Sequence, residues 1–328
     1  MTEGSESLLR PVADAGDLLC LAQLGRVTEV LVVGIRLGLF AALRSPKGEL
    51  ELGAAIDCRP AMLGPILRVC AQVGLLREVD GRWQCTPVAA RYLAGGELAF
   101  DQLVLHVARP EFVADRVIEL LRVGECPAPD DSEAHGAKAM AAGARHFSLI
   151  VARRLRRAAP RSLLDLGCGP GTLAITLCKH LPQLHALGLD TCAGALRTAA
   201  IEAERAGLSD RVRFEQADVR EVDLGESRFD LITAANLMHF FDDAQLDAQL
   251  ERVARALSSG GRLLILDTFA GAGTLAGELT ALEWLCWGGP FVRLDAIPEQ
   301  LRRHGLELGE IIELPGSTMH LVEAVKRC

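Results

Sequence analysis

The apolar positions of the first 123 residues predict helices around one short hairpin. A long run of apolar residues at helical spacing extends over 15–43. Further along, Asp80-Gly81 separates two short apolar segments, and this dipeptide strongly favours a two-residue β-hairpin. The shorter predicted elements are helices over 49–56, 60–73 and 97–123 and strands over 75–79 and 82–86. Helix, helix and hairpin in this order are typical of a winged helix, so we expect a first, mostly helical domain over 1–123.

The pattern changes after a proline-rich connection and a connecting helix, which we place at 124–159. From residue 160 to 328, short apolar runs alternate with helical segments, which predicts an α/β domain with helices on both faces of a parallel sheet. The last two strands flank Pro315-Gly316-Ser317 and predict a hairpin at the sheet edge. The predicted strands cover 162–166, 185–189, 212–215, 229–233, 263–266, 306–314 and 318–325, and the predicted helices among them cover 172–180, 193–206 and 243–257.

A glycine-rich turn directly after the first of these strands is the strongest chemical signal in the sequence. Gly167, Gly169 and Gly171 allow the backbone to turn sharply and to approach a ligand with no Cβ in the way. Their spacing departs from the G-x-G-x-x-G fingerprint of dinucleotide-binding proteins. Asp165 stands two residues before the first glycine. A carboxylate at this position suits a cationic ligand and would repel a pyrophosphate.

Acidic residues also follow the next two strands. Asp190 ends the second strand, roughly 20 residues after the turn, where an acidic side chain commonly binds the ribose hydroxyls of a nucleotide. Asp218 and Val219 follow the third strand, where they could hold an adenine amino group and one face of its ring. Each aspartate by itself is equally well explained as a cap of the next helix. Taken together, the set predicts a nucleoside site.

These residues resemble the class I S-adenosylmethionine-dependent methyltransferases, over about 160–328 of the chain. The resemblance implies a Rossmann-like sheet of seven strands and S-adenosylmethionine as the cofactor. It places Asp165 and Gly167 by the methionine part of the cofactor, Asp190 by the ribose and Asp218 by the adenine. The other residues expected to bind the cofactor are Gly169, Gly171, Val219 and Asn236.

A histidine and an acidic residue follow the fourth and fifth strands. His239 comes shortly after the fourth strand and Asp267 ends the fifth, and open α/β sheets bind their ligands at these carboxyl ends. A histidine beside a carboxylate can remove a proton from an acceptor hydroxyl. The alternative is that His239 only packs at the entry to a helix.

Together with the winged-helix half, this arrangement is similar to small-molecule O-methyltransferases related to the plant caffeate and the acetylserotonin enzymes. The resemblance implies an aromatic or enolic hydroxyl acceptor, with His239 as the base and Asp267 as its acidic partner. The chain departs from the family pattern in three places. Phe241 replaces the tryptophan of the family's His-Asp-Trp sequence, Ala235 replaces a common basic residue, and no second acidic partner is evident near 288–293. Methyl transfer to nitrogen, sulfur or carbon, other chemistry with this cofactor and a non-catalytic regulator that binds the cofactor stay open as alternatives.

Three further residues are predicted to line the acceptor pocket. Trp284 and Trp287 lie in an apolar helical segment between the fifth strand and the last hairpin, where they could stack on a flat acceptor. An equally good interpretation makes them core or dimer contacts. His146 could also face the pocket, although a half-buried helix position explains it as well.

The winged-helix half raises the alternative of nucleic-acid binding, and its charges argue against that function. Residues 1–95 contain ten Lys and Arg and ten Asp and Glu, and Arg68 is the single basic residue of the would-be recognition helix. A DNA-binding helix should present a basic face. The apolar segment over 18–43, dotted with glycines, instead predicts burial against a second copy in a two-fold homodimer.

Composition and charge narrow the remaining classes. The formal net charge of −8 disfavours general binding to phosphate backbones. We expect a cytoplasmic protein that does not span a membrane, because residues 1–10 lack the pattern of a signal peptide and the longest apolar stretch is too short to span. The ten cysteines contain no C-x-x-C pair, which predicts reduced thiols and no metal site.

Overall fold

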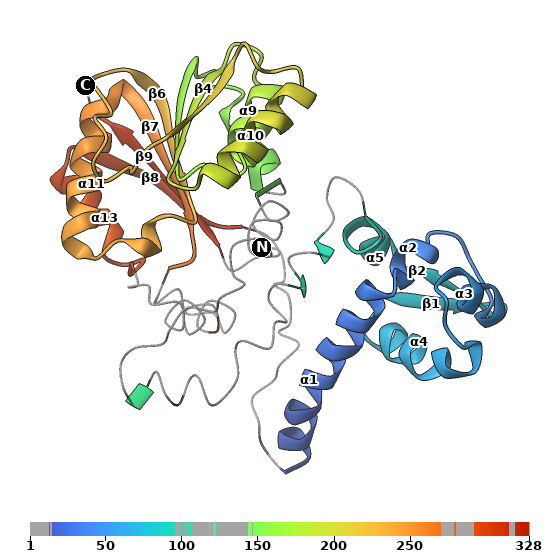
Figure 1. Ribbon diagram of the computed structural model, residues 1–328. Coiled ribbons are helices and arrows are strands. Elements are labelled where there is room, and N and C mark those ends of the chain that lie inside the picture. The colour runs from blue at the N-terminus through green and yellow to red at the C-terminus, as the bar shows by residue number, and fades with distance from the viewer. Residues whose placement is uncertain are drawn as a thin grey trace. The chain divides into compact units, whose positions relative to one another are not determined.

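The protein is described by a computed structural model that covers two compact units, 1–109 and 110–328 (Figure 1). Each unit has an apolar core of its own. Within the described part, no helix is both long enough and apolar enough to cross a membrane. The described residues are 13, 15–95, 100–101, 104–105, 118, 121–122, 144–145, 147–269, 279, 292–314 and 319–327.

The N-terminal unit packs short helices around a two-stranded hairpin. Its elements are α1 (Ala15–Arg36), α2 (Leu39–Ala42), α3 (Glu49–Ala55), η1 (Pro60–Met62), α4 (Leu63–Gln72), β1 (Leu76–Val79), β2 (Arg82–Cys85) and α5 (Pro87–Tyr92). The predicted hairpin is confirmed, because β1 and β2 pair antiparallel and Asp80 and Gly81 take φ values of 51° and 72°. Such positive φ angles are those that a two-residue turn of type I′ requires.

The single helix expected over 15–43 is wrong, because the structure breaks it into α1 and α2. Gly38 adopts a φ of 71°, a left-handed conformation that an α-helix does not tolerate but that glycine takes without a steric cost. The break turns α2 so that Leu39, Phe40 and Leu43 are at most 1% exposed in the core of this unit. Apolar periodicity alone did not reveal the break, since the pattern continues on both sides of it.

The C-terminal unit is built on a sheet of seven strands in the order β5-β4-β3-β6-β7-β9-β8. The first five of these run parallel, and β9 is antiparallel to both of its neighbours. This sheet confirms the predicted α/β fold with a terminal hairpin at one edge. The strands are β3 (Ser162–Leu166), β4 (His185–Asp190), β5 (Val212–Gln216), β6 (Phe229–Ala235), β7 (Leu257–Asp267), β8 (Leu306–Glu313) and β9 (His320–Lys326).

Helices cover both faces of the sheet, as expected. One face packs against α11 (Asp243–Ala256) and α13 (Ile297–Arg303), of which the second was not predicted from the sequence. The other face packs against α9 (Thr172–His180), α10 (Ala193–Arg205) and helical residues within 147–155. Figure 1 shows α11 and α13 on the side of the sheet opposite α9 and α10.

The register brings several chain segments to one edge of the sheet. The parallel strands β3, β4, β6 and β7 all end there, so the segments after Leu166, Asp190, Ala235 and Asp267 meet along this edge. Because β9 runs in the opposite direction, its first residue lies at the same edge, and His320 pairs directly with Asp267.

Candidate active site

The glycine-rich turn after β3 forms a loop in which each of the three predicted glycines has a positive φ angle. The φ values are 64° for Gly167, 51° for Gly169 and 74° for Gly171. A Cβ on Gly171 would lie 2.5 Å from the ring of Phe214 on β5, so the loop packs tightly against this side chain. A Cβ on Gly169 would meet no atom within 4 Å, so this part of the loop borders open space.

Asp165 lies beneath this loop and is 1% exposed. The Thr233 hydroxyl donates to its Oδ1 at 2.6 Å, and the backbone amide of Ala174 also interacts with this carboxylate. Burial raises the pKa of Asp165 to about 7. Hydrogen bonds from the Thr233 hydroxyl and the Ala174 amide oppose this shift, and the nearby charge of Asp190 adds to it. A buried carboxylate is costly even when it is hydrogen-bonded, and a bound cation would offset that cost.

Asp190 joins the glycine loop to the end of the second strand. Its Oδ2 accepts from the Gly169 amide at 2.8 Å, and its Oδ1 accepts from the Cys192 amide at 2.8 Å. Cys192 is the residue just before α10, so this hydrogen bond does not reach an amide within the first turn of that helix. The contact with Gly169 shows a different role, because it fixes the loop against β4.

Asp218 and Val219 lie in the segment that follows β5. Both carboxylate oxygens of Asp218 accept from Arg220, and the closest pair is 2.6 Å apart. Hydrogen bonds from Arg220 lower the pKa of Asp218, so this side chain stays ionised. Val219 is 6% exposed and packs into the core beside the sheet. A ligand amino group at this position would share Asp218 with Arg220.

Asn236 follows β6 and has a φ of 51°, outside the range that most residues with a side chain adopt. Its backbone N–H donates to the Leu266 carbonyl at 2.9 Å, and this bond holds the turn against β7. Strained backbone of this kind often occurs where a strand ends at a ligand site. The turn directs the chain into η2 (Met238–Phe240), the short helix that carries His239.

His239 and Asp267 form a buried pair at the sheet edge. His239 is 2% exposed and Asp267 is 1% exposed, and Nδ1 of the imidazole lies 3.0 Å from Oδ1 of the carboxylate. The amides of Met238 and Thr268 also donate to Asp267, each at 2.9 Å. Because an ionised carboxylate only accepts, Nδ1 carries the hydrogen in this contact, and the neutral ring then has its lone pair on Nε2.

Sequence reasoning missed a second histidine at this edge. His320 is 7% exposed, and its Nδ1 has no hydrogen-bond partner among the described residues. Its ring meets that of Phe269 in an edge-to-face arrangement with centroids 6.3 Å apart. The sequence feature nearest to His320 was the predicted start of the last strand at residue 318. Finding His320 also required the pairing of that strand with the end of β7.

Some predicted pocket residues cannot be placed. His146, Trp284 and Trp287 lie outside the described residues, so their role stays a prediction. Within the described ranges, no group of three or more His, Cys, Asp or Glu side chains is arranged to hold a metal ion.

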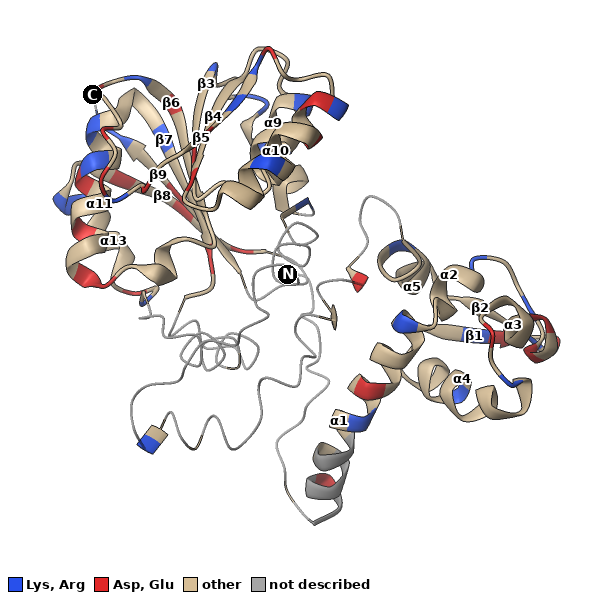
Figure 2. Ribbon diagram, in the orientation of Figure 1, with Lys and Arg blue, Asp and Glu red and all other residues tan. Residues whose placement is uncertain are grey.

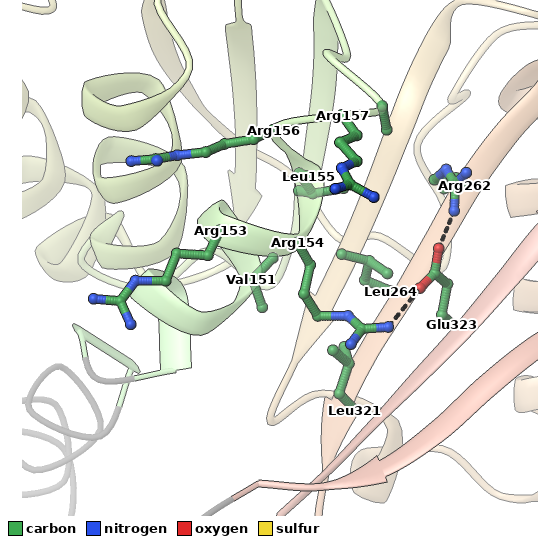
Figure 3. A pocket seen from close by; sticks show the side chains of 11 residues that line it. Val151, Arg153, Arg154, Leu155, Arg156, Arg157, Arg262, Leu264, Leu321 and Glu323 are labelled. Carbon is green, nitrogen blue, oxygen red and sulfur yellow. Dashed lines mark hydrogen bonds and ion pairs between the residues drawn. The ribbon is translucent and has the colours of Figure 1, made fainter.

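A cavity of about 560 Å³ lies elsewhere on this unit, between the helical residues 151–155 and strands β7 and β9. Figure 3 shows Glu323 there between Arg154 and Arg262, with which it forms ion pairs. Its lining is predominantly basic, so it would repel a sulfonium cation. The glycine loop, with its buried acid, therefore suits the cofactor better. The cavity is lined by Val151, Arg153, Arg154, Leu155, Arg156, Arg157, Ala158, Arg262, Leu264, Leu321 and Glu323.

The residues of the glycine loop fit S-adenosylmethionine. Asp165 offers a buried carboxylate that a positive charge would stabilise, and the absence of a Cβ at Gly169 leaves space for a ligand against the backbone. The carboxylate does not suit a pyrophosphate, which would bring its own negative charge next to Asp165.

Comparison with known proteins identifies both units as parts of a methyltransferase. Residues 163–261 match the family model of the methyltransferase domain, and residues 19–95 match that of the O-methyltransferase dimerisation domain. A 3-hydroxy-5-methyl-1-naphthoate 3-O-methyltransferase from Streptomyces sahachiroi is 30% identical over 263 residues, which are 73% of this chain and 73% of that relative. A demethylmenaquinone methyltransferase from Bacteroides fragilis is 31% identical over 129 residues, but only 37% of this chain and 52% of that enzyme are covered.

Solved structures share the fold along nearly the whole chain. Human N-acetylserotonin methyltransferase in complex with S-adenosylmethionine superposes with a TM-score of 0.77 at 18% identity, covering 97% of this chain and 100% of that one. An O-methyltransferase family protein from Burkholderia thailandensis gives a TM-score of 0.76 at 19% identity, covering 97% and 99%. The family models, the Streptomyces relative and the fold agree with the site, and the chain belongs to the S-adenosylmethionine-dependent O-methyltransferases that carry an N-terminal dimerisation domain.

Proposed function

We propose that this methyltransferase acts on a hydroxyl of a small aromatic molecule and that His239 removes the hydroxyl proton. The observation that carries the proposal is the buried contact of His239 Nδ1 with Asp267 at 3.0 Å. The name of the Streptomyces relative, which specifies methylation at a naphthoate hydroxyl, supports the choice of acceptor.

Asp267 would fix both the orientation and the tautomer of the imidazole. Three donors hold its carboxylate in place, namely the amides of Met238 and Thr268 and the His239 ring. With Nδ1 bound to the acid, proton transfer from the acceptor falls to Nε2. The carboxylate also stabilises the imidazolium that forms when the proton arrives.

Removal of the proton matters because a neutral phenol is a poor nucleophile. A free phenol and a free imidazole differ by about 3.5 pKa units, so complete transfer before attack would cost about 5 kcal/mol. Transfer during attack avoids most of this cost. S-adenosylmethionine supplies the electrophilic methyl group when bound. We infer that Asp165, Asp190 and the glycine loop bind and orient it, with Asn236, Asp218 and Val219 on the adjoining segments.

The N-terminal unit would serve association of two copies of the chain. It matches the dimerisation domain, and α1 exposes apolar side chains along its length. Helix α4 has a single basic position, Arg68, and no acidic one, which is too little charge for a DNA-binding face (Figure 2). A cytoplasmic location and the absence of nucleic-acid binding stay predictions. Among the described side chains of α1 and the turn that follows it, the exposed large apolar ones are Leu21, Leu24, Val33 and Leu37.

The acceptor atom is tested with a matched pair of probes. Release of S-adenosylhomocysteine is measured with 3-hydroxy-1-naphthoate and with 3-amino-1-naphthoate, which differ only in the atom to be methylated. We expect turnover of the hydroxyl compound and little turnover of the amine. Equal or faster methylation of the amine would overturn the assignment to oxygen.

A further inference from the structure

Three side chains form a row along the carboxyl edge of the sheet. Strands β6, β7 and β9 are neighbours in the sheet. His239 lies in η2 shortly after β6, Asp267 ends β7 and His320 begins β9, so the three residues follow one another along the edge in that order. The acid contacts His239 at 3.0 Å, and it is the direct pairing partner of His320. Pairing partners on adjacent strands have Cβ atoms about 5 Å apart, so both imidazoles lie within roughly 10 Å of each other.

The alternation of side chains along the strands puts this row on one face. On β9, Val322 packs into the core shared with α11 and α13, and His320 is two residues from it. On β7, Ile265 packs into the same core and is two residues from Asp267. Side chains two residues apart in a strand point to the same side. The contact of His320 with Phe269, which belongs to that core, agrees with this placement.

His320 has a hydrogen-bonding capacity that the described protein does not use. The residue is 7% exposed, and its Nδ1 is buried with no hydrogen-bond partner among the described residues. Burial lowers the pKa of His320, and the charge of Glu313, its partner on β8, opposes that shift. A neutral imidazole can present Nδ1 either as a donor or as an acceptor, depending on its tautomer. An unpaired polar atom in the interior is costly, and a ligand atom would relieve that cost.

We propose that His320 determines acceptor specificity by hydrogen-bonding a second oxygen substituent of the acceptor, such as a carboxylate, while His239 acts on the hydroxyl that is methylated. The inference rests on the proposed function and specifies it further. The proposal predicts a preference for aromatic acceptors with two oxygen substituents on one ring. The distance between these substituents must match the distance between the two imidazoles on either side of Asp267. Asp267 itself has three donors on its oxygens and serves His239.

The test compares two acceptors with and without the second substituent. The probes are 3-hydroxy-1-naphthoate and 2-naphthol, which lacks only the carboxylate. Variant His320→Phe removes the hydrogen-bonding atoms and keeps a ring of similar size, and His320→Asn restores a polar atom near the position of Nδ1. The matched control is His304→Phe, because His304 lies at the end of α13 and contacts Asp247 instead of the site.

We expect His320→Phe to lower kcat/KM for the carboxylate probe about tenfold or more, mainly through a higher KM, since the lost bond involves a charged group. The change for 2-naphthol should stay within about threefold, and His320→Asn should recover part of the loss. Equal losses for both probes, or no loss for either, would overturn the proposal. So would a similar selective loss in His304→Phe.

A binding measurement separates this inference from the proposed function. Titration of each probe into the protein saturated with S-adenosylhomocysteine gives acceptor affinity without turnover. If the native protein binds 3-hydroxy-1-naphthoate but does not methylate it, the proposed function fails. The role of His320 is still supported in that case if the native protein binds this probe more tightly than 2-naphthol and His320→Phe removes the difference. If the native protein binds neither probe, or both equally, the role of His320 is overturned.

Discussion

Nδ1 of His239 donates to Oδ1 of Asp267 over 3.0 Å, and neither side chain is more than 2% exposed. A hydrogen-bonded pair of ionisable side chains buried at the end of a strand needs a reason beyond stability, because burial of ionisable groups is costly. Proton removal from the acceptor supplies such a reason, and it can be tested by changing each partner.

Replacement of His239 by Ala should lower kcat by about 10²–10⁴-fold, the usual contribution of a general base. The measurement is turnover at saturating cofactor and acceptor, with the affinity for S-adenosylhomocysteine expected to stay unchanged. His304→Ala is the control, since it removes a histidine that also contacts an aspartate at 3.0 Å but lies away from the site. A loss of only a few-fold in His239→Ala would leave positioning of the acceptor as the main source of rate.

Replacement of Asp267 by Asn should impair turnover through the same histidine. The amide can keep one oxygen as an acceptor, but its NH₂ group would favour an acceptor at Nδ1 and so a proton on Nε2, where the base must be unprotonated. We expect kcat to fall on the order of 10²-fold or more. In the double variant with His239→Ala, the two losses should not multiply, because the residues act as a unit. Multiplicative losses would show that the two act independently.

Cofactor affinity should depend on pH through Asp165. Burial raises the pKa of this carboxyl to about 7 in the ligand-free protein, and only its ionised form attracts the positive charges of S-adenosylmethionine. Affinity should therefore rise as the pH increases through about 7 and level off above it. Calorimetry with S-adenosylhomocysteine, whose amino group is also cationic, across this range checks the expectation. A flat profile would remove Asp165 from cofactor recognition.

Thr233 provides the control for this titration. Its hydrogen bond to Asp165 favours the ionised carboxyl, so Thr233→Val should move the midpoint of the affinity profile to higher pH. The stability of the ligand-free protein should change in the opposite sense to affinity. Because the folded-state pKa is raised, the contribution of Asp165 is present below about 4 and is lost as the pH rises through about 7.

Much of the fold followed from the sequence because the dominant signals are local. The glycine turn after β3 and the Asp80-Gly81 hairpin each fall where they were predicted, since both depend on backbone angles that few residues adopt. The break at Gly38 and the helix α13 were missed. Apolar spacing continues across the first, and the second has only seven residues, so neither gives a long periodic pattern.

The candidate site was predicted less completely, because its contacts join distant parts of the chain. The sequence placed His239 and Asp267 at neighbouring strand ends but did not show which ring nitrogen meets the acid. Asp190 and Asp218 were predicted by their positions after strands. Their contacts with Gly169 and Arg220 could not be predicted, because they depend on how the chain folds. His320 was missed, since its place beside Asp267 follows only from the antiparallel register of β9.

Two glycines of the same loop should respond differently to replacement by Ala. In Gly171→Ala the new Cβ meets the Phe214 ring at 2.5 Å at a φ of 74°, so we expect a loss of stability of about 2–4 kcal/mol from overpacking and backbone strain. In Gly169→Ala the Cβ meets nothing within 4 Å, and only strain of about 1 kcal/mol is expected.

Cofactor affinity should show the reverse order for these two variants. The methyl group of Gly169→Ala would fill the space beside the loop that we assign to the cofactor, and we expect at least about a tenfold weaker affinity, on the order of 1.4 kcal/mol. Thermal melting without ligand and calorimetry with S-adenosylhomocysteine measure the two effects. The Gly171→Ala variant should recover stability when Phe214 is changed to Leu. Equal effects of both glycine variants on affinity would argue that the loop is only structural.

Apolar side chains on α1 should hold two copies of the chain together. Leu21 and Leu24 lie one helical turn apart on the same face of α1 and are 42% and 38% exposed within one copy, and a second copy would cover them. A Leu21→Glu/Leu24→Glu variant places four carboxylates in a two-fold interface on this face of α1, because every substitution occurs in both copies. Burying unpaired charges costs several kcal/mol, so sedimentation at about 10 μM should show a dimer for the native chain and a monomer for the variant. Leu50→Glu, at a residue 78% exposed on α3, is the control and should remain dimeric. A native monomer would contradict the homodimer, and a dimeric double variant would place the interface elsewhere.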